Sequence, residues 1–339
     1  MISKITNTKL NNKKLITKKT KRKSNKYSKL HSKLHIGCHI SITPSILDGI
    51  KYGESIGANA FQIFMGSNRS ASLKTKTKLT SEECREIKEY VSRNNLSLVI
   101  HSIYLLNFCS YPPYSGRIKY QHDNIQYDLK YGSLIGAKCV VLHIGFKTDL
   151  TEDEAIKNLI SNINNICKHI PDGIMLSLET SACRGSEMGC TLEQLETIWK
   201  GVRHNNKAGI KKVGFVIDTA HIFSSGYDIS NVNGITNYLK RFDKMIGLNN
   251  VCAFHINDAK YKLGAHKDEH MGIGSGTIFD TDSGMQSLKY IKTLCLKKKI
   301  PMILETHSAG KIDSEGSRYS QTHKGIKGYE YEIDLIKKL

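Results

Sequence analysis

The sequence lacks several features that would place it in a specialised class of protein. No run of apolar residues approaches the roughly 20 that a membrane-spanning helix needs, and no signal-peptide pattern opens the chain. The nine cysteines are scattered, odd in number and without a C-x-x-C pair, which argues against a disulfide framework and against a zinc finger. We therefore expect an intracellular protein in a reducing compartment, and the sequence does not distinguish nuclear, cytoplasmic and viral settings.

Acidic residues are missing from the first 35 positions, which hold twelve lysines and arginines. The chain of 339 residues has a net charge of +19, so most of the excess lies in this segment. The segment has no apolar periodicity and too little hydrophobicity to fold by itself. We expect residues 1–34 to form a disordered basic extension that binds a polyanion, serves as a nuclear-targeting run or has no specific role. Residues 35–339 then form the folded domain.

Eight short apolar runs recur from residue 35 onward, and each ends in polar residues. They lie at 35–41, 60–66, 96–102, 139–145, 175–180, 213–221, 251–258 and 301–307. Most are nearly continuous and rich in β-branched or aromatic residues, which is typical of buried parallel strands. Segments with helical periodicity separate them, most clearly at 151–167. Eight strands alternating with about eight helices predict an α/β fold, a (β/α)₈ TIM barrel. A doubly wound open sheet is the alternative, but no G-x-G-x-x-G motif follows the first strand.

Three predicted helices begin with a capping box, in which a Thr and a Glu or Gln three residues later satisfy each other's backbone N–H groups. The pairs are Thr80 with Glu83, Thr151 with Glu154, and Thr191 with Gln194.

Polar ligand-type residues end six consecutive predicted strands, the third to the eighth. In chain order they are His101, His143, Glu179, Asp218 with His221, His255 and Glu305, and the stretch after the seventh strand adds Asp268 and His270. The C-terminal strand ends of such a barrel form its active site. Burying these groups without compensation costs several kcal/mol for each unpaired charge. Bound divalent cations remove that cost, and mixed imidazole and carboxylate ligands are typical of zinc. Nine candidates predict a multinuclear site, most simply three ions that share a carboxylate.

In the segments that contain these residues, the chain resembles the endonuclease IV family of apurinic/apyrimidinic-site DNA endonucleases. Seven segments match in family order, and the similarity spans roughly residues 35 to 339. They are "HSIYLLN" (101–107), "VLHIG" (141–145), "SLET" (177–180), "FVIDTAH" (215–221), "FHINDAK" (254–260), "KDEHMGIG" (267–274) and "LETH" (304–307). The basic extension lies outside the match.

The resemblance implies three zinc ions that hydrolyse the phosphodiester 5′ to an abasic site in duplex DNA, leaving a 3′-hydroxyl and a 5′-deoxyribose phosphate. One zinc would be held by His101, His143 and Glu179; a second by Glu179, Asp218, His255 and Glu305; and the third by His221, Asp268 and His270. Glu179 and Glu305 are the expected catalytic carboxylates, because Glu179 is shared by two ions and Glu305 can also orient the nucleophile. We expect Asp258 to be a hydrogen-bonding partner of a ligand, and His266 to lie at the surface or contact phosphate.

The resemblance also implies DNA-contacting residues, since an abasic nucleotide must leave the duplex to be cut. Tyr104 and Leu105 match the family's intercalating pair, and Arg69 matches an arginine inserted at the lesion. The tryptophan that often follows this arginine is absent, because "SASLK" comes after Arg69. A monomer acting on DNA is the family expectation.

Two other functions fit the same pattern less well. A metal-dependent sugar isomerase or epimerase shares the barrel and several strand-end ligands, but generally uses one or two ions with mostly carboxylate ligands. A non-catalytic nucleic-acid-binding protein would be expected to have lost a His or Glu from the set. The resemblance also implies 3′-phosphodiesterase activity and a role in base excision repair.

Overall fold

The computed structural model describes residues 34–205, 212–306 and 328–339. The predicted basic extension, residues 1–34, therefore lies outside the described residues except for its last position. The folded unit is His35–Leu339. No helix in the described ranges is both long enough and apolar enough to cross a membrane.

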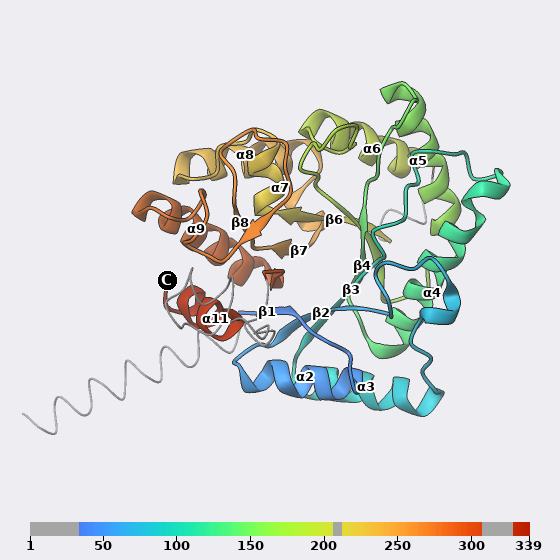
Figure 1. Cartoon of the computed structure of the whole chain (residues 1–339), viewed down its shortest axis with the longest axis horizontal. Helices are drawn as coiled ribbons and strands as arrows, with labels where there is room; N and C mark the ends of the chain where they lie inside the picture. Colours follow the sequence, from blue (N-terminus) through green and yellow to red (C-terminus); the bar gives the residue numbers. More distant parts are fainter. Residues whose placement is uncertain (1–33, 206–211, 307–327) are drawn as a thin grey trace, which may run out of the picture. The chain divides into compact units, whose positions relative to one another are not determined.

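Eight parallel strands close into a barrel (Figure 1). The strands are β1 Ile36–His39, β2 Ala60–Phe64, β3 Ser97–His101, β4 Cys139–His143, β5 Met175–Glu179, β6 Val213–Asp218, β7 Val251–His255 and β10 Met302–Leu304. Their order around the barrel is β1-β10-β7-β6-β5-β4-β3-β2, so the first strand pairs with the last. This closure confirms the predicted (β/α)₈ barrel. The open-sheet alternative is wrong, because an open sheet would leave two edges unpaired.

Helices alternate with the strands and cover the outside of the barrel (Figure 1). The α-helices are α2 Ile46–Ser55, α3 Ser81–Arg93, α4 Lys119–Ile135, α5 Glu152–Cys167, α6 Leu192–Asn205, α7 Thr219–Ser224, α8 Val232–Met245, α9 Asp282–Lys298 and α11 Gly328–Lys338. Within the described ranges, short 3₁₀ helices lie at Leu73–Thr75, Gly116–Ile118 and Leu248–Asn250.

The first two predicted capping boxes are confirmed, at the starts of α3 and α5. The third is only half right. The Thr191 hydroxyl accepts a hydrogen bond from the backbone N–H of Gln194. The Gln194 side chain, however, accepts from the backbone N–H groups of Gly189 and Cys190. It therefore ties down the preceding loop instead of completing the cap.

A small hairpin that the sequence did not predict lies beyond the seventh barrel strand. Its two-residue strands are β8 Asp258–Ala259 and β9 His270–Met271, paired antiparallel with Ala259 opposite His270. Such short strands contain too few residues to give an alternating pattern. The pairing brings His270 back toward the strand from which the loop departed.

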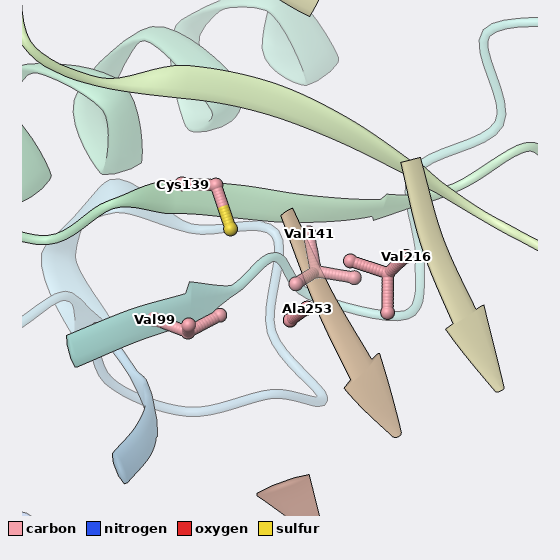
Figure 2. Packing of buried hydrophobic residues seen from close by; sticks show 5 residues of the cluster. All are labelled: Val99, Cys139, Val141, Val216 and Ala253. Carbon is pink, nitrogen blue, oxygen red and sulfur yellow. The ribbon is translucent and has the colours of Figure 1, made fainter. Parts of the chain in front are cut away.

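Five small apolar residues fill part of the barrel interior (Figure 2). They are Val99, Cys139, Val141, Val216 and Ala253, all fully buried. Because side chains two positions apart on a strand point to the same face, the residue two positions beyond four of them also points into the barrel. Those residues are His101, His143, Asp218 and His255. The apolar packing therefore aims four polar groups at the mouth of the barrel.

The C-terminal helix α11 contacts the barrel mouth through the buried Glu332. Its carboxylate accepts hydrogen bonds from the Thr306 hydroxyl (2.6 Å) and from the backbone N–H of Ile273 (2.7 Å). Burial, assisted by the charge of Asp258, raises the pKa of Glu332 to about 7. The neutral acid is thus favoured in the folded protein.

This raised pKa predicts a pH-dependent stability that Glu332→Gln removes. Because the folded pKa is above the unfolded one, the contribution of Glu332 is fully present below about pH 4.5 and is lost as the pH rises through about 7. In urea unfolding, the wild type should lose up to about 3 kcal/mol more than the variant between pH 5 and pH 8. Equal pH dependence of the two proteins would contradict this assignment.

Candidate metal centre

The nine candidate ligands converge at the C-terminal end of the barrel. The strand register places His143 opposite Glu179 and Asp218 opposite His255, so ligands from neighbouring strands lie side by side. The pocket above them has a volume of about 550 Å³. Its lining includes His101, His143, Glu179, His221, Asp268, His270 and Glu305.

A first group is formed by His101, His143 and Glu179. Glu179 Oε2 lies 3.3 Å from His101 Nε2 and 3.0 Å from His143 Nε2. His101 Nδ1 lies 2.7 Å from the carbonyl oxygen of Ser102. When Nδ1 carries the proton and donates it to this carbonyl, Nε2 is free to bind a cation, as is usual for metal-binding histidines.

A second group shares Glu179 with the first and adds Asp218, His255 and Glu305. His255 Nδ1 lies 2.7 Å from Glu179 Oε1 and 3.1 Å from Glu305 Oε2. The distance from the same nitrogen to Asp218 Oδ2 is 3.8 Å. One imidazole and three carboxylates therefore surround one point.

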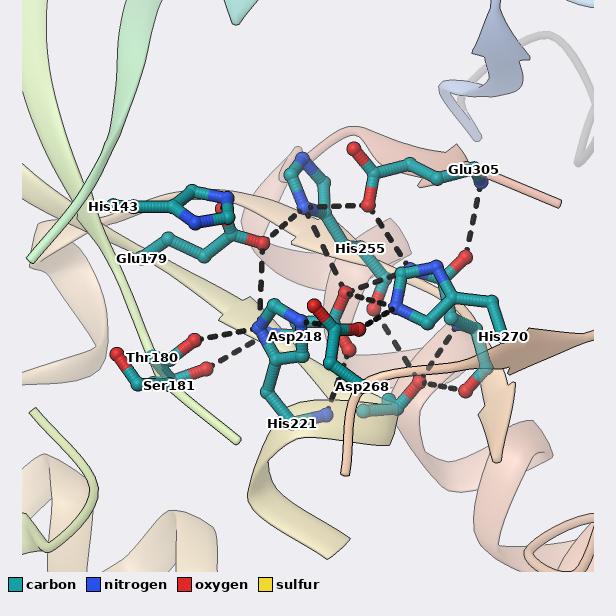
Figure 3. A network of polar contacts seen from close by, with 12 residues as sticks. His143, Glu179, Thr180, Ser181, Asp218, His221, His255, Asp268, His270 and Glu305 are labelled. Carbon is teal, nitrogen blue, oxygen red and sulfur yellow. Dashed lines mark hydrogen bonds and ion pairs between the residues drawn. The ribbon is translucent and has the colours of Figure 1, made fainter. Parts of the chain in front are cut away.

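The third group contains His221, His270 and Asp268 (Figure 3). Asp268 Oδ1 lies 3.2 Å from His221 Nε2 and 3.1 Å from His270 Nε2. Asp218 joins this group as well, because its carboxylate and ring nitrogens of both histidines lie within 4.8 Å of one another. The resemblance did not imply that Asp218 would stand between the second and third groups.

The donor atoms of these groups fit metal ions. Among the ligand atoms of these groups in the described part of the chain, three are buried and make no hydrogen bond, although each faces an oppositely charged group: Glu179 Oε2, His221 Nε2 and His270 Nε2. Each unsatisfied buried polar atom lowers the stability of the fold by about 1–3 kcal/mol. Glu179 Oε2 belongs to the first group, and both histidine nitrogens belong to the third. Imidazole nitrogen with carboxylate oxygen is a ligand set that zinc accepts. Divalent cations would thus satisfy atoms that make no hydrogen bond in the described part of the chain.

Burial and neighbouring charges shift the pKa values in the centre in opposite directions, and the neighbouring charges dominate. Burial disfavours ionisation of Glu179, but the facing imidazoles of His255 and His143 outweigh it and hold its pKa well below the usual range. Burial also disfavours a charged His221, yet the carboxylates of Asp218 and Asp268 outweigh it and raise the pKa of His221 well above the usual value. Positive charge is therefore favoured at this point, whether it comes from protons or from metal ions.

Gln62 on β2 is a buried residue that the sequence analysis missed. Its Oε1 accepts from Nε2 of His255 (2.8 Å), while its Nε2 donates to Glu305 Oε1 (2.6 Å) and to Nδ1 of His39 (3.3 Å). Burial lowers the pKa of His39 to about 4, so His39 is neutral and can accept this bond. Gln62 thereby fixes the His255 tautomer that leaves Nδ1 facing the carboxylates. A polar residue inside the apolar run "AFQIFMG" was the available signal.

Replacing Gln62 by methionine keeps the volume of the side chain but removes all three hydrogen bonds. We expect a loss of about 10–100-fold in metal affinity or activity, as for other residues that orient ligands. The affinity for divalent metal ions would be measured by titration of both variants and the wild type. Gln126→Met is the matched control, because Gln126 lies on α4 and bonds only the backbone of Ile166 among the contacts described. Equal behaviour of the two variants would show that Gln62 orients nothing.

Asn257 joins two carboxylates of the second group. Its side-chain N–H groups donate to Asp218 Oδ2 (2.6 Å) and Glu305 Oε2 (3.1 Å), and its Oδ1 accepts from the backbone N–H of Glu305 (3.0 Å). The Thr219 hydroxyl donates to the Asn257 carbonyl oxygen. Asn257 therefore performs the positioning role that the sequence analysis gave to its neighbour.

The expectation that Asp258 hydrogen-bonds a metal ligand is wrong. Its carboxylate accepts from backbone N–H groups of the chain around and after the small hairpin, at distances of 2.9 to 3.4 Å. The donors are Ala259, Gly274, Gly276, Ile278 and Phe279. Asp258 thus holds the loop that follows His270 in place. His266 is exposed and belongs to none of the three groups.

The predicted DNA-contacting residues lie at the rim of the centre. Tyr104 is half exposed and its ring stands 5.3 Å from that of His101. Leu105, the next residue in the chain, is 49% exposed. Arg69 is exposed and lines a neighbouring hollow together with Tyr104 and Glu305. The structure thus places Tyr104 and Arg69 beside candidate ligands, and Leu105 follows Tyr104 in the chain.

The structure contains one cross-link between cysteines. Cys183 and Cys190 form a disulfide in the loop after β5, whereas the other seven cysteines are free. A single bond across seven positions is not the multi-bond framework that the sequence analysis excluded.

Comparison with known proteins gives a consistent relationship over most of the chain. The family model for xylose isomerase-like TIM barrels matches residues 50–339. "Putative endonuclease 4" of Acanthamoeba polyphaga mimivirus is 33% identical over 261 residues, which cover 76% of this chain and 80% of that protein. "Probable endonuclease 4" of Shouchella clausii strain KSM-K16 is 34% identical, with coverage of 84% and 89%. The crystal structure of endonuclease IV from Thermus thermophilus has a TM-score of 0.65 and 24% identity, with coverage of 83% and 96%. At that identity the structural likeness supports the fold alone, so the sequence relatives carry the relationship.

Proposed function

Because this chain belongs to the endonuclease IV family, we propose that it is a DNA-repair nuclease that cuts the phosphodiester 5′ to abasic sites in duplex DNA. It acts as a monomer with three zinc ions, leaves a 3′-hydroxyl and a 5′-deoxyribose phosphate, and also removes blocking groups as a 3′-phosphodiesterase. The observation that carries the proposal is the set of three adjoining ligand groups in one pocket, with Glu179 common to two of them.

The residues of the centre have distinct roles in this proposal. One ion would be held by His101, His143 and Glu179. A second would be held by Glu179, Asp218, His255 and Glu305. The third would be held by His221, Asp268 and His270. Zinc, when bound, supplies Lewis acidity toward phosphate oxygens and makes water nucleophilic at neutral pH. Glu305, held by Gln62 and Asn257, orients the attacking water toward phosphorus.

Recognition of the lesion rests on the rim. Tyr104, half exposed beside the ligands, and the exposed Leu105 that follows it form a wedge that enters the base stack and holds the abasic nucleotide outside the helix. Arg69 contacts the strand or the gap left at the lesion. Residues 1–34, outside the described residues, are proposed to add sequence-independent affinity for the phosphate backbone.

The sugar isomerase alternative uses the same barrel, so the ligand chemistry must separate the two. An isomerase needs one or two ions and a base that moves a proton between carbons. Five histidines in three groups favour more ions and a phosphate substrate. A sugar substrate would also leave the exposed pair Tyr104 and Leu105 without a role.

The test is incision of a duplex that carries one tetrahydrofuran abasic analogue, with and without chelator. We expect a single cut 5′ to the analogue, lost in chelator and restored by zinc. Cutting at another bond, or no cutting by the metal-replete protein, would sink the proposal. An undamaged duplex of the same sequence is the control.

A further inference from the structure

The loop between β5 and α6, residues 180–191, contributes Arg184 to the wall of the metal pocket. Arg184 in this loop is the one arginine or lysine among the described residues that line the pocket. Its side chain is 41% exposed. A permanent positive charge at this place has no role in holding cations, which it would repel.

Glu187 holds the guanidinium of Arg184 by one edge. Glu187 Oε1 accepts from Nε (2.9 Å) and from Nη2 (2.6 Å), and its Oε2 accepts from the backbone N–H of Arg184 (2.8 Å). Of the five N–H donors of a guanidinium, these bonds use two. The Nη1 donors therefore remain available on the pocket side, where Nη1 stands 3.6 Å from Asp268 Oδ2.

The loop that carries Arg184 is fixed at several points. The Cys183–Cys190 disulfide joins its two ends, and the Met188 N–H donates to the Gly145 carbonyl oxygen (2.8 Å). The Ser181 hydroxyl donates to the Met188 carbonyl oxygen (2.7 Å). An arginine held in this way loses little further conformational freedom when it binds a ligand. Its free edge is preorganised.

We propose that Arg184 is a binding residue for the DNA backbone, contacting a phosphate oxygen of the strand that enters the metal pocket through its Nη1 edge. The inference rests on the proposed function, because it takes DNA as the substrate. Guanidinium is the side chain best suited to phosphate, through charge-assisted and paired hydrogen bonds. A phosphate seated on the metal centre places its flanking backbone beside the pocket wall.

A different role for Arg184 would be to position Asp268 as a ligand. The distance of 3.6 Å is too long for a hydrogen bond, and Asp268 already faces His221 and His270 at 3.2 and 3.1 Å. The two roles predict different measurements. Loss of a positioning residue changes metal content, whereas loss of a phosphate contact changes DNA affinity and its salt dependence.

The experiment compares the wild type with Arg184→Gln, Arg184→Lys and Arg241→Gln. Arg241 on α8 is the matched control, since its guanidinium also pairs with a glutamate at 2.7 Å and is 52% exposed, but it does not line the pocket. Binding of the metal-loaded proteins to a tetrahydrofuran duplex with a cleavage-resistant phosphorothioate at the scissile linkage would be followed by fluorescence anisotropy across a salt series. Zinc content and single-turnover incision would be measured on the metal-loaded proteins.

We expect Arg184→Gln to weaken binding about tenfold and to reduce the salt slope by about 0.9, with unchanged zinc content. Arg184→Lys should keep the salt slope and lose only about threefold in affinity, because lysine keeps the positive charge but lacks the paired N–H donors of a guanidinium. Arg241→Gln should behave as the wild type. Unchanged affinity of Arg184→Gln, or a change confined to zinc content, would overturn the inference. If instead the wild type fails to incise the duplex, the proposed function itself has failed.

Discussion

Glu179→Gln is expected to reduce incision at the abasic analogue by at least about 10³-fold. Both of its oxygens are in use, with Oε1 2.7 Å from His255 and Oε2 3.0 Å from His143. An amide replaces one oxygen by an NH₂ group that cannot bind a cation, and two ligand groups lose their common member. The zinc content should therefore fall by at least one ion per chain.

Single-turnover cleavage and metal analysis check this expectation on the same samples. Glu193→Gln is the matched control, because Glu193 lies on α6, is 63% exposed and pairs only with Arg241 among the ion pairs described. Its rate and zinc content should match those of the wild type. Near-normal incision by Glu179→Gln would remove the shared carboxylate from the mechanism.

The second large effect is on stability, at the buried ion pair of Lys76 and Asp128. Lys76 Nζ lies 2.7 and 2.9 Å from the two carboxylate oxygens, and the side chains are 1% and 0% exposed. Burial raises the pKa of Asp128 to about 6 even though Lys76 opposes the shift. Desolvation at this place is therefore severe.

Asp128→Ala leaves the Lys76 ammonium buried without its partner and is expected to lower the free energy of unfolding by about 3–5 kcal/mol. Urea unfolding of the metal-replete protein measures this change. The double variant Lys76→Met/Asp128→Leu should recover most of the loss, because apolar residues of similar volume often replace a buried pair without penalty. Asp123→Ala, which breaks an exposed pair with Lys119 on the same helix, should cost less than about 1 kcal/mol.

The same pair bears on DNA binding. Lys76 follows the loop that carries Arg69, and a backbone bridge joins it to Gly66 at the start of that loop. Loosening the pair should therefore weaken affinity for the abasic duplex as well. A decrease of less than about 1 kcal/mol in the free energy of unfolding of Asp128→Ala would contradict a stabilising role of Asp128 toward the buried Lys76 ammonium.

The fold was accessible from the sequence because its signals are local. Continuous apolar runs gave all eight barrel strands, and two of three capping boxes were correct. The β8–β9 hairpin and the use of Gln194 as a loop anchor depend on contacts that local patterns do not encode. Strand spacing alone cannot say which loop folds back over the barrel.

The candidate site was accessible for a different reason. A barrel brings its strand ends together, so polar residues after apolar runs had to meet, and the structure does bring all nine into one mouth. The supporting residues were not accessible in this way. Gln62 and Asn257 look like ordinary strand and loop residues until their partners are placed. The disulfide that closes the Arg184 loop depends on a turn that spacing does not reveal.

The most direct test of the central claim is a zinc titration of chelator-treated protein, with bound zinc and abasic-site incision recorded at every step. We expect saturation at about three ions per chain, with full incision only as the last sites fill. Saturation at one ion, or full incision with one ion bound, would contradict a centre built from three ligand groups.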